Sequence, residues 1–271
     1  MQHFRTVIAC VLTALCVSAV PAIADVLVGS SDGETLTGTA RPDQLYGDGG
    51  DDTLIGDLAN DYLEGGPGND RILAGPGDDL ALGGTGNDRV EGDDGDDVVY
   101  AGAGNDEVLG EAGNDTLFGQ VGDDKIYGGP GNDLIYTGAG AEGDPSATQT
   151  VAAGDFVDAG AGDDAVIAEG IQANIIGGTG DDNIIARTGN MTINAGGGKD
   201  TVHTGSGNDS IILGSGRDSA NTGRGNDTID SRDGRKDVVN CSSGTDTVKA
   251  DQFDKLKGCE NVERKPAKRR R

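Results

Sequence analysis

The sequence predicts an all-β repeat protein, and its composition and periodicity carry that prediction. The chain has 271 residues, of which 49 are Gly and 38 are Asp. Because Gly and Asp are poor helix formers, this composition argues against a helical protein. Four Phe, five Tyr and no Trp provide too little bulk for a large conventional core. Val, Ile and Leu recur at regular spacing, which separates the chain from Gly-rich disordered sequences.

The first 24 residues form a segment of a different kind. Arg5 gives a short basic start, residues 6–20 are an apolar run, and residues 22–24 (AIA) form an A-x-A cleavage site. We interpret residues 1–24 as a signal peptide, because the apolar run is short for a membrane span. An uncleaved anchor is the alternative. The prediction is a secreted, extracellular protein with no transmembrane anchor.

The charge of the remaining chain restricts its partners. Residues 25–263 carry a net charge of −33 once the leader and the basic tail 264–271 (RKPAKRRR) are set apart. Such a body repels nucleic acid and anionic membranes, so neither is an expected partner. The charge also opposes compaction, so the body either stays unfolded or is neutralised by cations.

A nine-residue repeat accounts for the excess of Gly and Asp. The segments GGPGNDRIL (65–73) and GGPGNDLIY (128–136) share the pattern GGxGxDxLx. The frame runs without a gap over residues 29–136 and returns over 159–230, followed by a ten-residue variant and one last unit that ends at 249. In the first run, position six is acidic and position eight is apolar in every unit. A constant period of this kind predicts a stack of repeats.

These repeats resemble the RTX, or haemolysin-type, calcium-binding nonapeptide repeats of bacterial secreted proteins. The resemblance implies a right-handed parallel β-roll (a β-solenoid), in which two nonapeptides make one turn. Six residues of each unit would form a loop and three a short strand. It also implies multiple Ca²⁺ ions, held between loops stacked at the same edge. Members of the family exported by type I secretion lack a cleaved leader, so the leader predicted here makes a pore-forming toxin an unexpected assignment.

The residue types in the repeat point to the same ion. Gly at positions one, two and four lets backbone carbonyls approach closely, and Asp at position six adds a short carboxylate. Calcium prefers oxygen ligands, whereas zinc prefers Cys and His, which are scarce after residue 24. Carboxylates on stacked loops repel one another without a cation, so we expect folding on calcium binding. The predicted ligands are Asp43, Asp52, Asp61, Asp70, Asp79, Asp88, Asp97, Asp106, Asp115, Asp124, Asp133, Asp164, Asp182, Asp200, Asp209, Asp218 and Asp227.

The array departs from its pattern in one region. An insertion of 13 residues (AEGDPSATQTVAA, about 141–154) precedes Asp155, where the pattern resumes. The next two units on the same edge have Ala173 and Met191 where Asp is expected. Two interpretations stay open: the insertion folds along this edge and replaces metal there, or the repeats have decayed beside an unrelated loop.

Positions seven and nine are expected to face outward, because position eight faces the narrow interior. One sheet presents Tyr46, Tyr62, Tyr100, Phe118 and Tyr136 at these positions, whereas the other is more polar. An apolar side of this kind indicates a surface for a glycan or a protein partner. Alternatively, aromatic residues favour strands and stack as ladders that stabilise the sheet. The basic tail is either a contact to an anionic cell-wall polymer or a solvated end.

The C-terminal residues are expected to close the roll. Cys241 and Cys259 remain in a secreted chain and are predicted to form a disulfide. We expect segment 250–263 to cap the roll, with Phe253, Leu256 and Val262 as a plug. The predicted organisation is a signal peptide at 1–24, repeats at 25–249, a cap at 250–263 and a basic tail at 264–271.

No catalytic constellation is found in the sequence. His203 falls on an outward strand position, and the chain has no H-E-x-x-H motif. Paired carboxylates occur throughout, so none is singled out for acid–base catalysis. The sequence therefore predicts a non-enzymatic, calcium-binding β-roll that serves as a structural or adhesive surface module. The alternative is a calcium-dependent enzyme, or a domain attached to one, acting on extracellular polysaccharide. No oligomeric state is predicted.

Overall fold

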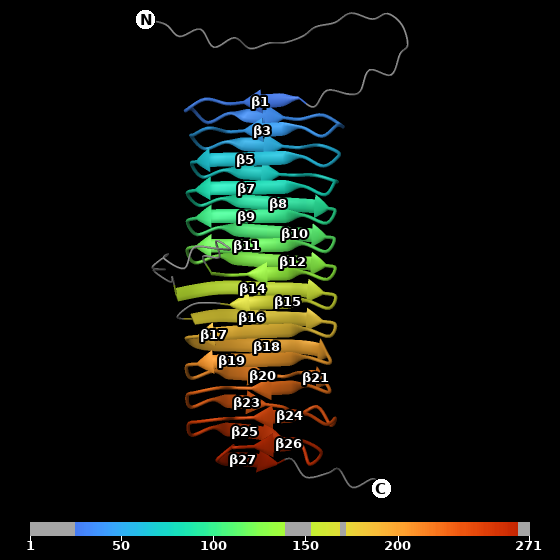
Figure 1. The fold of residues 1–271 in the computed structure, drawn as a ribbon, viewed down its shortest axis with the longest axis vertical. Helices are drawn as coiled ribbons and strands as arrows, with labels where there is room; N and C mark the ends of the chain where they lie inside the picture. Colours follow the sequence, from blue (N-terminus) through green and yellow to red (C-terminus); the bar gives the residue numbers. More distant parts are fainter. Residues whose placement is uncertain (1–24, 139–152, 169–171, 265–271) are drawn as a thin grey trace, which may run out of the picture.

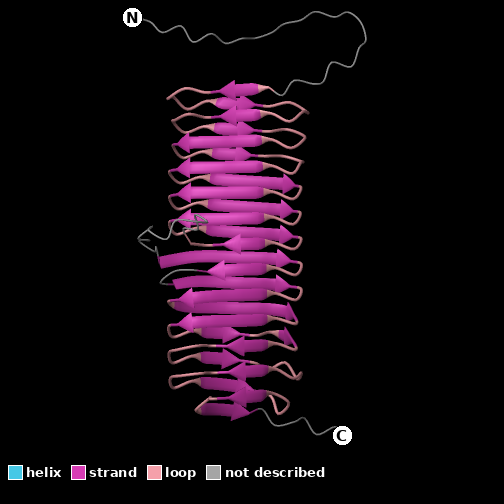
Figure 2. Ribbon diagram, viewed as in Figure 1, coloured by secondary structure: helices cyan, strands magenta, loops and turns pink. Residues whose placement is uncertain are grey.

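The structure, a computed structural model, describes residues 25–138, 153–168 and 172–264. These residues form a long parallel β-solenoid with its two ends at opposite poles (Figure 1). Figure 2 shows strands and connecting loops throughout, and none of these residues is helical. Accordingly, they contain no helix able to cross a membrane. The predicted signal peptide, most of the insertion and most of the basic tail lie outside the described residues.

Two parallel sheets face each other along the whole solenoid. The 13-stranded sheet consists of β1 (Val26–Val28), β3 (Gln44–Tyr46), β5 (Tyr62–Pro67), β7 (Leu80–Thr85), β9 (Val98–Ala103), β11 (Thr116–Val121), β13 (Leu134–Tyr136), β15 (Ala165–Ala168), β17 (Asn183–Thr188), β19 (Thr201–Ser206), β22 (Ser219–Asn221), β24 (Val238–Asn240) and β26 (Lys255–Lys257). The 14-stranded sheet consists of β2 (Thr35–Thr37), β4 (Thr53–Ile55), β6 (Arg71–Leu73), β8 (Arg89–Asp94), β10 (Glu107–Ala112), β12 (Lys125–Pro130), β14 (Ala153–Ala161), β16 (Gln172–Thr179), β18 (Asn190–Gly198), β20 (Ser210–Ile212), β21 (Ser215–Gly216), β23 (Thr228–Asp230), β25 (Thr247–Ala250) and β27 (Asn261–Arg264). Successive strands alternate between the sheets over most of the chain, as expected if two nonapeptides make one turn.

The register follows the repeat. Paired residues are 18 positions apart in most of the solenoid, as in Leu117 of β11 and Ile135 of β13. Across the insertion, Ile126 of β12 pairs with Val157 of β14, which is a separation of 31. The difference of 13 equals the length of the insertion, so the stack continues in register on both sides of it. Strands such as β9 are longer than the expected three residues, because the parallel ladder continues into the glycines of the next loop.

The core is a thin apolar column between the sheets. Position-eight side chains fill it, and they are fully buried from the third strand onward in residues such as Leu45, Leu63, Val99 and Ile135. Alternation along each strand sends their neighbours outward, which explains how short strands can bury one large side chain per repeat. The expectation of a narrow interior in place of a large core is confirmed.

Most of the described aromatic side chains lie on the outer face of the 13-stranded sheet, whereas Tyr127 and Phe156 form a tilted pair on the 14-stranded sheet. Tyr100, Phe118 and Tyr136 stack in a row, with ring centroids 4.5 Å and 4.9 Å apart and nearly parallel planes. Tyr46 and Tyr62 form a separate tilted pair. The stacked faces are used by the rings themselves, so the row contributes to the sheet as a cross-strand ladder.

The C-terminal segment differs from the expected plug. Strands β26 and β27 pair with β24 and β25, so residues 255–264 continue both sheets. Phe253 and Val262 are 54 % and 42 % exposed, and only Leu256 packs against the core. The three-residue plug is therefore wrong for two of its members. The predicted disulfide is present, with the Cα atoms of Cys241 and Cys259 5.2 Å apart.

Candidate metal sites

The position-six side chains form two columns inside the loops, one at each edge of the solenoid. The first column precedes the strands of the 14-stranded sheet and holds Asp52, Asp70, Asp88, Asp106, Asp124, Asp155, Asp209, Asp227 and Asp246. The second column precedes the strands of the 13-stranded sheet and holds Asp43, Asp61, Asp79, Asp97, Asp115, Asp133, Asp164, Asp182, Asp200, Asp218, Asp237 and Asp254. Every predicted ligand is at most 4 % exposed.

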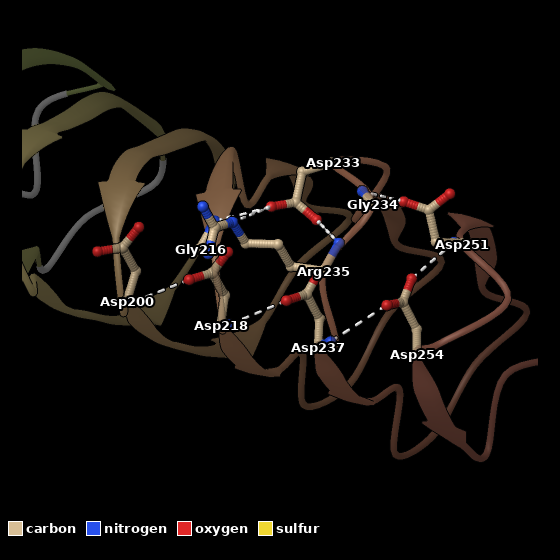
Figure 3. A network of polar contacts seen from close by, with 9 residues as sticks. All are labelled: Asp200, Gly216, Asp218, Asp233, Gly234, Arg235, Asp237, Asp251 and Asp254. Atoms are coloured by element: carbon tan, nitrogen blue, oxygen red, sulfur yellow. Dashed lines mark hydrogen bonds and ion pairs between the residues drawn. The ribbon is translucent and has the colours of Figure 1, made fainter. Parts of the chain in front are cut away.

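One oxygen of each carboxylate is used to join neighbouring turns. The backbone N–H of Asp79 donates to Oδ1 of Asp97, at 2.8 Å, and that of Asp97 donates to Oδ1 of Asp115, at 2.9 Å. Figure 3 shows the same single file at the C-terminal end of the second column, from Asp200 through Asp218 and Asp237 to Asp254. At the C-terminal end of the first column a Glu continues the ladder, since the carboxylate of Glu260 accepts from the N–H of Asp246 at 2.9 Å.

The other oxygen is buried without a partner. Among the described residues, 18 carboxylates of the two columns have an Oδ2 atom that accepts no hydrogen bond. They include 16 of the 17 predicted ligands, all except Asp43, together with Asp237 and Asp246. Buried polar atoms in folded proteins nearly always have a partner, so a repeated orphan of one kind indicates a missing ligand.

In the loops that have glycine at position one, the orphaned oxygen faces a second oxygen across that glycine. A Cβ atom placed on Gly92 would clash with Oδ2 of Asp97 and lie 2.7 Å from the carbonyl oxygen of Gly110. A Cβ on Gly110 would likewise clash with Asp115 and lie 2.6 Å from the carbonyl oxygen of Gly128. Since real Cβ contacts this short are not seen, glycine keeps the space open. A carboxylate oxygen and a main-chain oxygen of the next turn therefore converge beside it.

Burial changes the acidity of the columns. It raises the pKa of Asp79 and Asp97 to about 7, and that of Asp124 to about 8. The N–H donated from the preceding turn works against the rise, whereas neighbouring carboxylates add to it. Desolvation and like charges both disfavour the ionised form of these carboxyls. A cation bound beside them would stabilise the ionised form.

A second ladder, formed by position-five side chains, runs in the opposite direction on the exposed side of the loops. Oδ1 of Asn69 accepts from the backbone N–H of Asn87, and Oδ1 of Asn87 accepts from that of Asn105, both at 2.8 Å. Here the acceptor lies in the earlier turn, whereas in the position-six columns it lies in the later turn. Because these oxygens already accept hydrogen bonds at the surface, position five is not where a partner is missing.

The carboxylates at the ends are satisfied by the protein. In the first two loops, the Ser30 hydroxyl donates to Glu34, and the Thr39 N–H and hydroxyl donate to Oδ2 of Asp43 at 2.5 Å and 2.9 Å. The site predicted at Asp43 therefore differs from the others. The reason is visible in the sequence, since a hydroxyl residue occupies position two in these two loops, whereas the other loops of the first run have Gly, Asp, Glu or Gln there.

At the other end, Asp254 closes the second column. Its Oδ1 accepts from the N–H of Asp237 and its Oδ2 from the N–H of Asp251 and the hydroxyl of Ser231 (Figure 3 shows the first two bonds). Asp237 and Asp246, in contrast, carry orphaned oxygens that the sequence reasoning missed. The extra residue in the unit at 231–240 shifts Asp237 out of frame, whereas Asp246 sits at position six of the last unit.

The first column is interrupted after the insertion. Ala173 and Met191 take the place of Asp there, and both are 2 % exposed. Both belong to the apolar core, as do Ala168 and Ala186. This edge therefore buries apolar side chains where the neighbouring turns bury carboxylates. The two interpretations of the insertion itself concern residues outside the described part of the chain.

The donor set fits a hard cation. Over the described residues, no three His, Cys, Asp or Glu side chains come together as a metal cluster, so a site must combine carboxylate with main-chain oxygens. That combination suits Ca²⁺, which accepts backbone carbonyls in a flexible shell, and does not suit zinc. The fold and its columns thus define a class: a parallel β-solenoid whose repeated loops present oxygen ligands.

Comparison with known families agrees with this chemistry. The family described as RTX calcium-binding nonapeptide repeat (4 copies) matches at 28–63, 56–90, 73–108, 82–117, 109–141, 176–211, 204–235 and 212–248. These matches cover more than half of the chain, so the protein belongs to the RTX calcium-binding repeat family and binds Ca²⁺ at multiple sites. Comparison with curated proteins finds no match.

Proposed function

We propose that this chain is a secreted structural module that folds when calcium fills its two columns, with the position-six aspartates as the ligands. The observation that carries the proposal is the row of 18 buried carboxylate oxygens without a hydrogen bond. Leaving a buried polar group unpaired costs about 1–3 kcal/mol. A domain is stable by only about 5–15 kcal/mol, so the roll requires a cation at many of these positions.

Circular dichroism and hydrogen exchange during a calcium titration test whether folding depends on calcium binding. The expected result is loss of the β-sheet signal in excess chelator and its cooperative return on adding Ca²⁺, with Mg²⁺ as the matched control ion. Magnesium retains its waters and demands stricter geometry, so it is expected to restore far less structure. Complete β-structure and full amide protection in chelator would contradict the proposal.

Secretion is supported by two features of the chain. The first is the leader-like segment at residues 1–24, and the second is the Cys241–Cys259 disulfide, which is typical of oxidising compartments. Expression of the full chain in a secreting host, followed by N-terminal sequencing of the mature protein, tests the cleavage of the leader. The expected new N-terminus is Asp25.

An adhesive role is the second part of the proposal. Its support is the apolar outer face of the 13-stranded sheet, where Leu82 pairs with Tyr100 and Leu134 lies on the same strand as Tyr136, together with the basic residues at 264–271. Since the rings cover one another, contact with a partner would use their edges and the aliphatic neighbours. A glycan and cell-wall binding screen with and without chelator, followed by product analysis, separates adhesion from the alternative of polysaccharide cleavage.

A further inference from the structure

The turns that follow the insertion differ from their neighbours along the first column. Among the described residues, the orphaned carboxylate oxygens of this column run as far as Asp124 and resume at Asp209. Between them, position six is held by Asp155, which has no orphaned oxygen, and by the apolar Ala173 and Met191. Three successive loops on this edge therefore carry none of the unpaired buried oxygens that make the other loops depend on a cation.

The β-ladder extends into these loops. In an ordinary turn, pairing begins at position seven, as with Leu80 of β7 opposite Val98 of β9. Between β16 and β18 it already includes position six, where Ala173 lies opposite Met191. Accordingly, β14, β16 and β18 have nine, eight and nine residues and are the longest strands of the described chain. Main-chain hydrogen bonds thus join these turns at a place where other turns are joined through carboxylates.

The apolar core is also wider in this part of the roll. Position one is glycine in ten of the twelve units of the first run, but here it is alanine in four of five units. These alanines, Ala159, Ala168, Ala186 and Ala195, are at most 2 % exposed and belong to the same core cluster as Met191. The loops therefore bury apolar surface, and that burial stabilises a turn whether or not an ion is bound.

The opposite edge of the same turns keeps its carboxylates. Asp164, Asp182 and Asp200 of the second column each have an orphaned oxygen. These turns are therefore not independent of calcium. They have unpaired carboxylate oxygens on one edge, whereas turns such as those of Asp79 and Asp88 have them on both.

We infer that the post-insertion turns (residues 153–168 and 172–198) are the nucleus of the roll, the first part to fold as calcium rises and the last to unfold as it is withdrawn. The inference rests on the proposed function, since it concerns the order in which calcium-dependent turns fold. Each turn of a solenoid contacts only its neighbours, so a turn that is stable at low calcium provides an edge on which the next turn forms. Folding then spreads from the post-insertion turns toward both ends.

Hydrogen exchange of the full chain, followed peptide by peptide over a series of buffered Ca²⁺ concentrations, tests this order. Peptides from β16 and β18 should become protected at about tenfold lower free Ca²⁺ than peptides from β6 to β9 or from β23 to β25. The factor follows because leaving one buried oxygen unpaired changes a folding equilibrium by about that much. One common midpoint for all peptides, or earlier protection at either end of the roll, overturns the inference.

A double variant tests the residues that carry the inference. Ala173→Asp, Met191→Asp places a carboxylate at position six in both loops, so the midpoints of β16 and β18 should rise to those of the flanking turns. Met191→Leu is the matched control, because it conserves the volume of an apolar core residue, and it should leave the order of folding unchanged. An early midpoint kept by the Asp variant overturns the inference. The measurement on the parent decides the order even if the Asp variant does not fold.

The same data separate this inference from the proposed function. If all turns keep their amide protection in chelator, calcium-coupled folding is refuted. If protection is lost in chelator and returns at one midpoint throughout the chain, the inference fails alone. Protection confined to the post-insertion turns in chelator supports both.

Discussion

Replacing Asp97 by Asn should change stability in opposite directions with and without calcium. Asp97 is 1 % exposed, its Oδ1 accepts from Asp79 and its Oδ2 has no partner. Burial raises its pKa from 3.8 to about 7. At about 1.4 kcal/mol per pKa unit, discounted by half for solvent screening at the loop, ionisation costs the metal-free fold about 2 kcal/mol.

Asparagine keeps the oxygen that accepts from Asp79 and removes the charge. In chelator at pH 8, the metal-free fold of Asp97→Asn should therefore be more stable than that of the parent by about 2 kcal/mol. When a stabilising osmolyte is used to refold the two proteins, the variant should reach its folding midpoint at a lower osmolyte concentration. In the absence of osmolyte, the variant should need more calcium to fold, because one ligand oxygen is replaced by an amide. Both midpoints are measured by circular dichroism.

The adjacent Asp96→Asn is the control. Asp96 is exposed and its Oδ1 accepts from the N–H of Asn114 at 2.8 Å, so the same chemical change there alters no orphaned oxygen. It should shift both midpoints by less than about 0.5 kcal/mol. If Asp97→Asn destabilises the chain to the same extent with and without calcium, the carboxylate is a packing group and the reasoning is refuted.

Three further predictions concern pH, the disulfide and the core. In chelator, the β-sheet signal should grow as the pH falls from about 8 toward 4, because carboxyls such as Asp124, whose pKa is raised to about 8, favour folding when protonated; a signal independent of pH would contradict this. Removing the Cys241–Cys259 bridge, which spans 18 residues, should cost about 3 kcal/mol in calcium-loaded denaturant unfolding, and no change in midpoint would refute it. Ile135→Ala, at a fully buried position, should cost about 2–5 kcal/mol in the same assay, against less than about 0.5 kcal/mol for Ile212→Ala at a 51 % exposed one.

The fold could be predicted from the sequence because the same nine-residue period sets both the turns of the backbone and the positions of the buried side chains. A single apolar residue every nine positions, as at Leu45 and Leu54, predicts which side chains are buried. The columns followed for the same reason, since Asp at position six recurs in register. Where the nine-residue period is kept, the local sequence and the stacking of turns favour the same structure, so that structure can be predicted.

The predictions fail where a residue outside the nine-residue pattern alters a contact or shifts the frame. The satisfaction of Asp43 depends on the side chain of Thr39, which the nine-residue frame treats as a variable glycine position. Asp237 lies in a unit lengthened by one residue, so counting passes over it although the ladder from Asp218 reaches it. Phe253 was expected in a plug, but the chain adds two more strands there and leaves the ring exposed. None of these contacts repeats along the sequence, so the nine-residue pattern could not predict them.

The axial stacking of the turns has a mechanical consequence. Each turn is hydrogen-bonded to its neighbours along the long axis, and the two ends of the described chain lie at opposite poles (Figure 1). Tension applied to those ends would load the turns in series, so the weakest junction between turns would open first and release a discrete length. With ions between the loops, the tensile strength of the rod would depend on the surrounding calcium concentration.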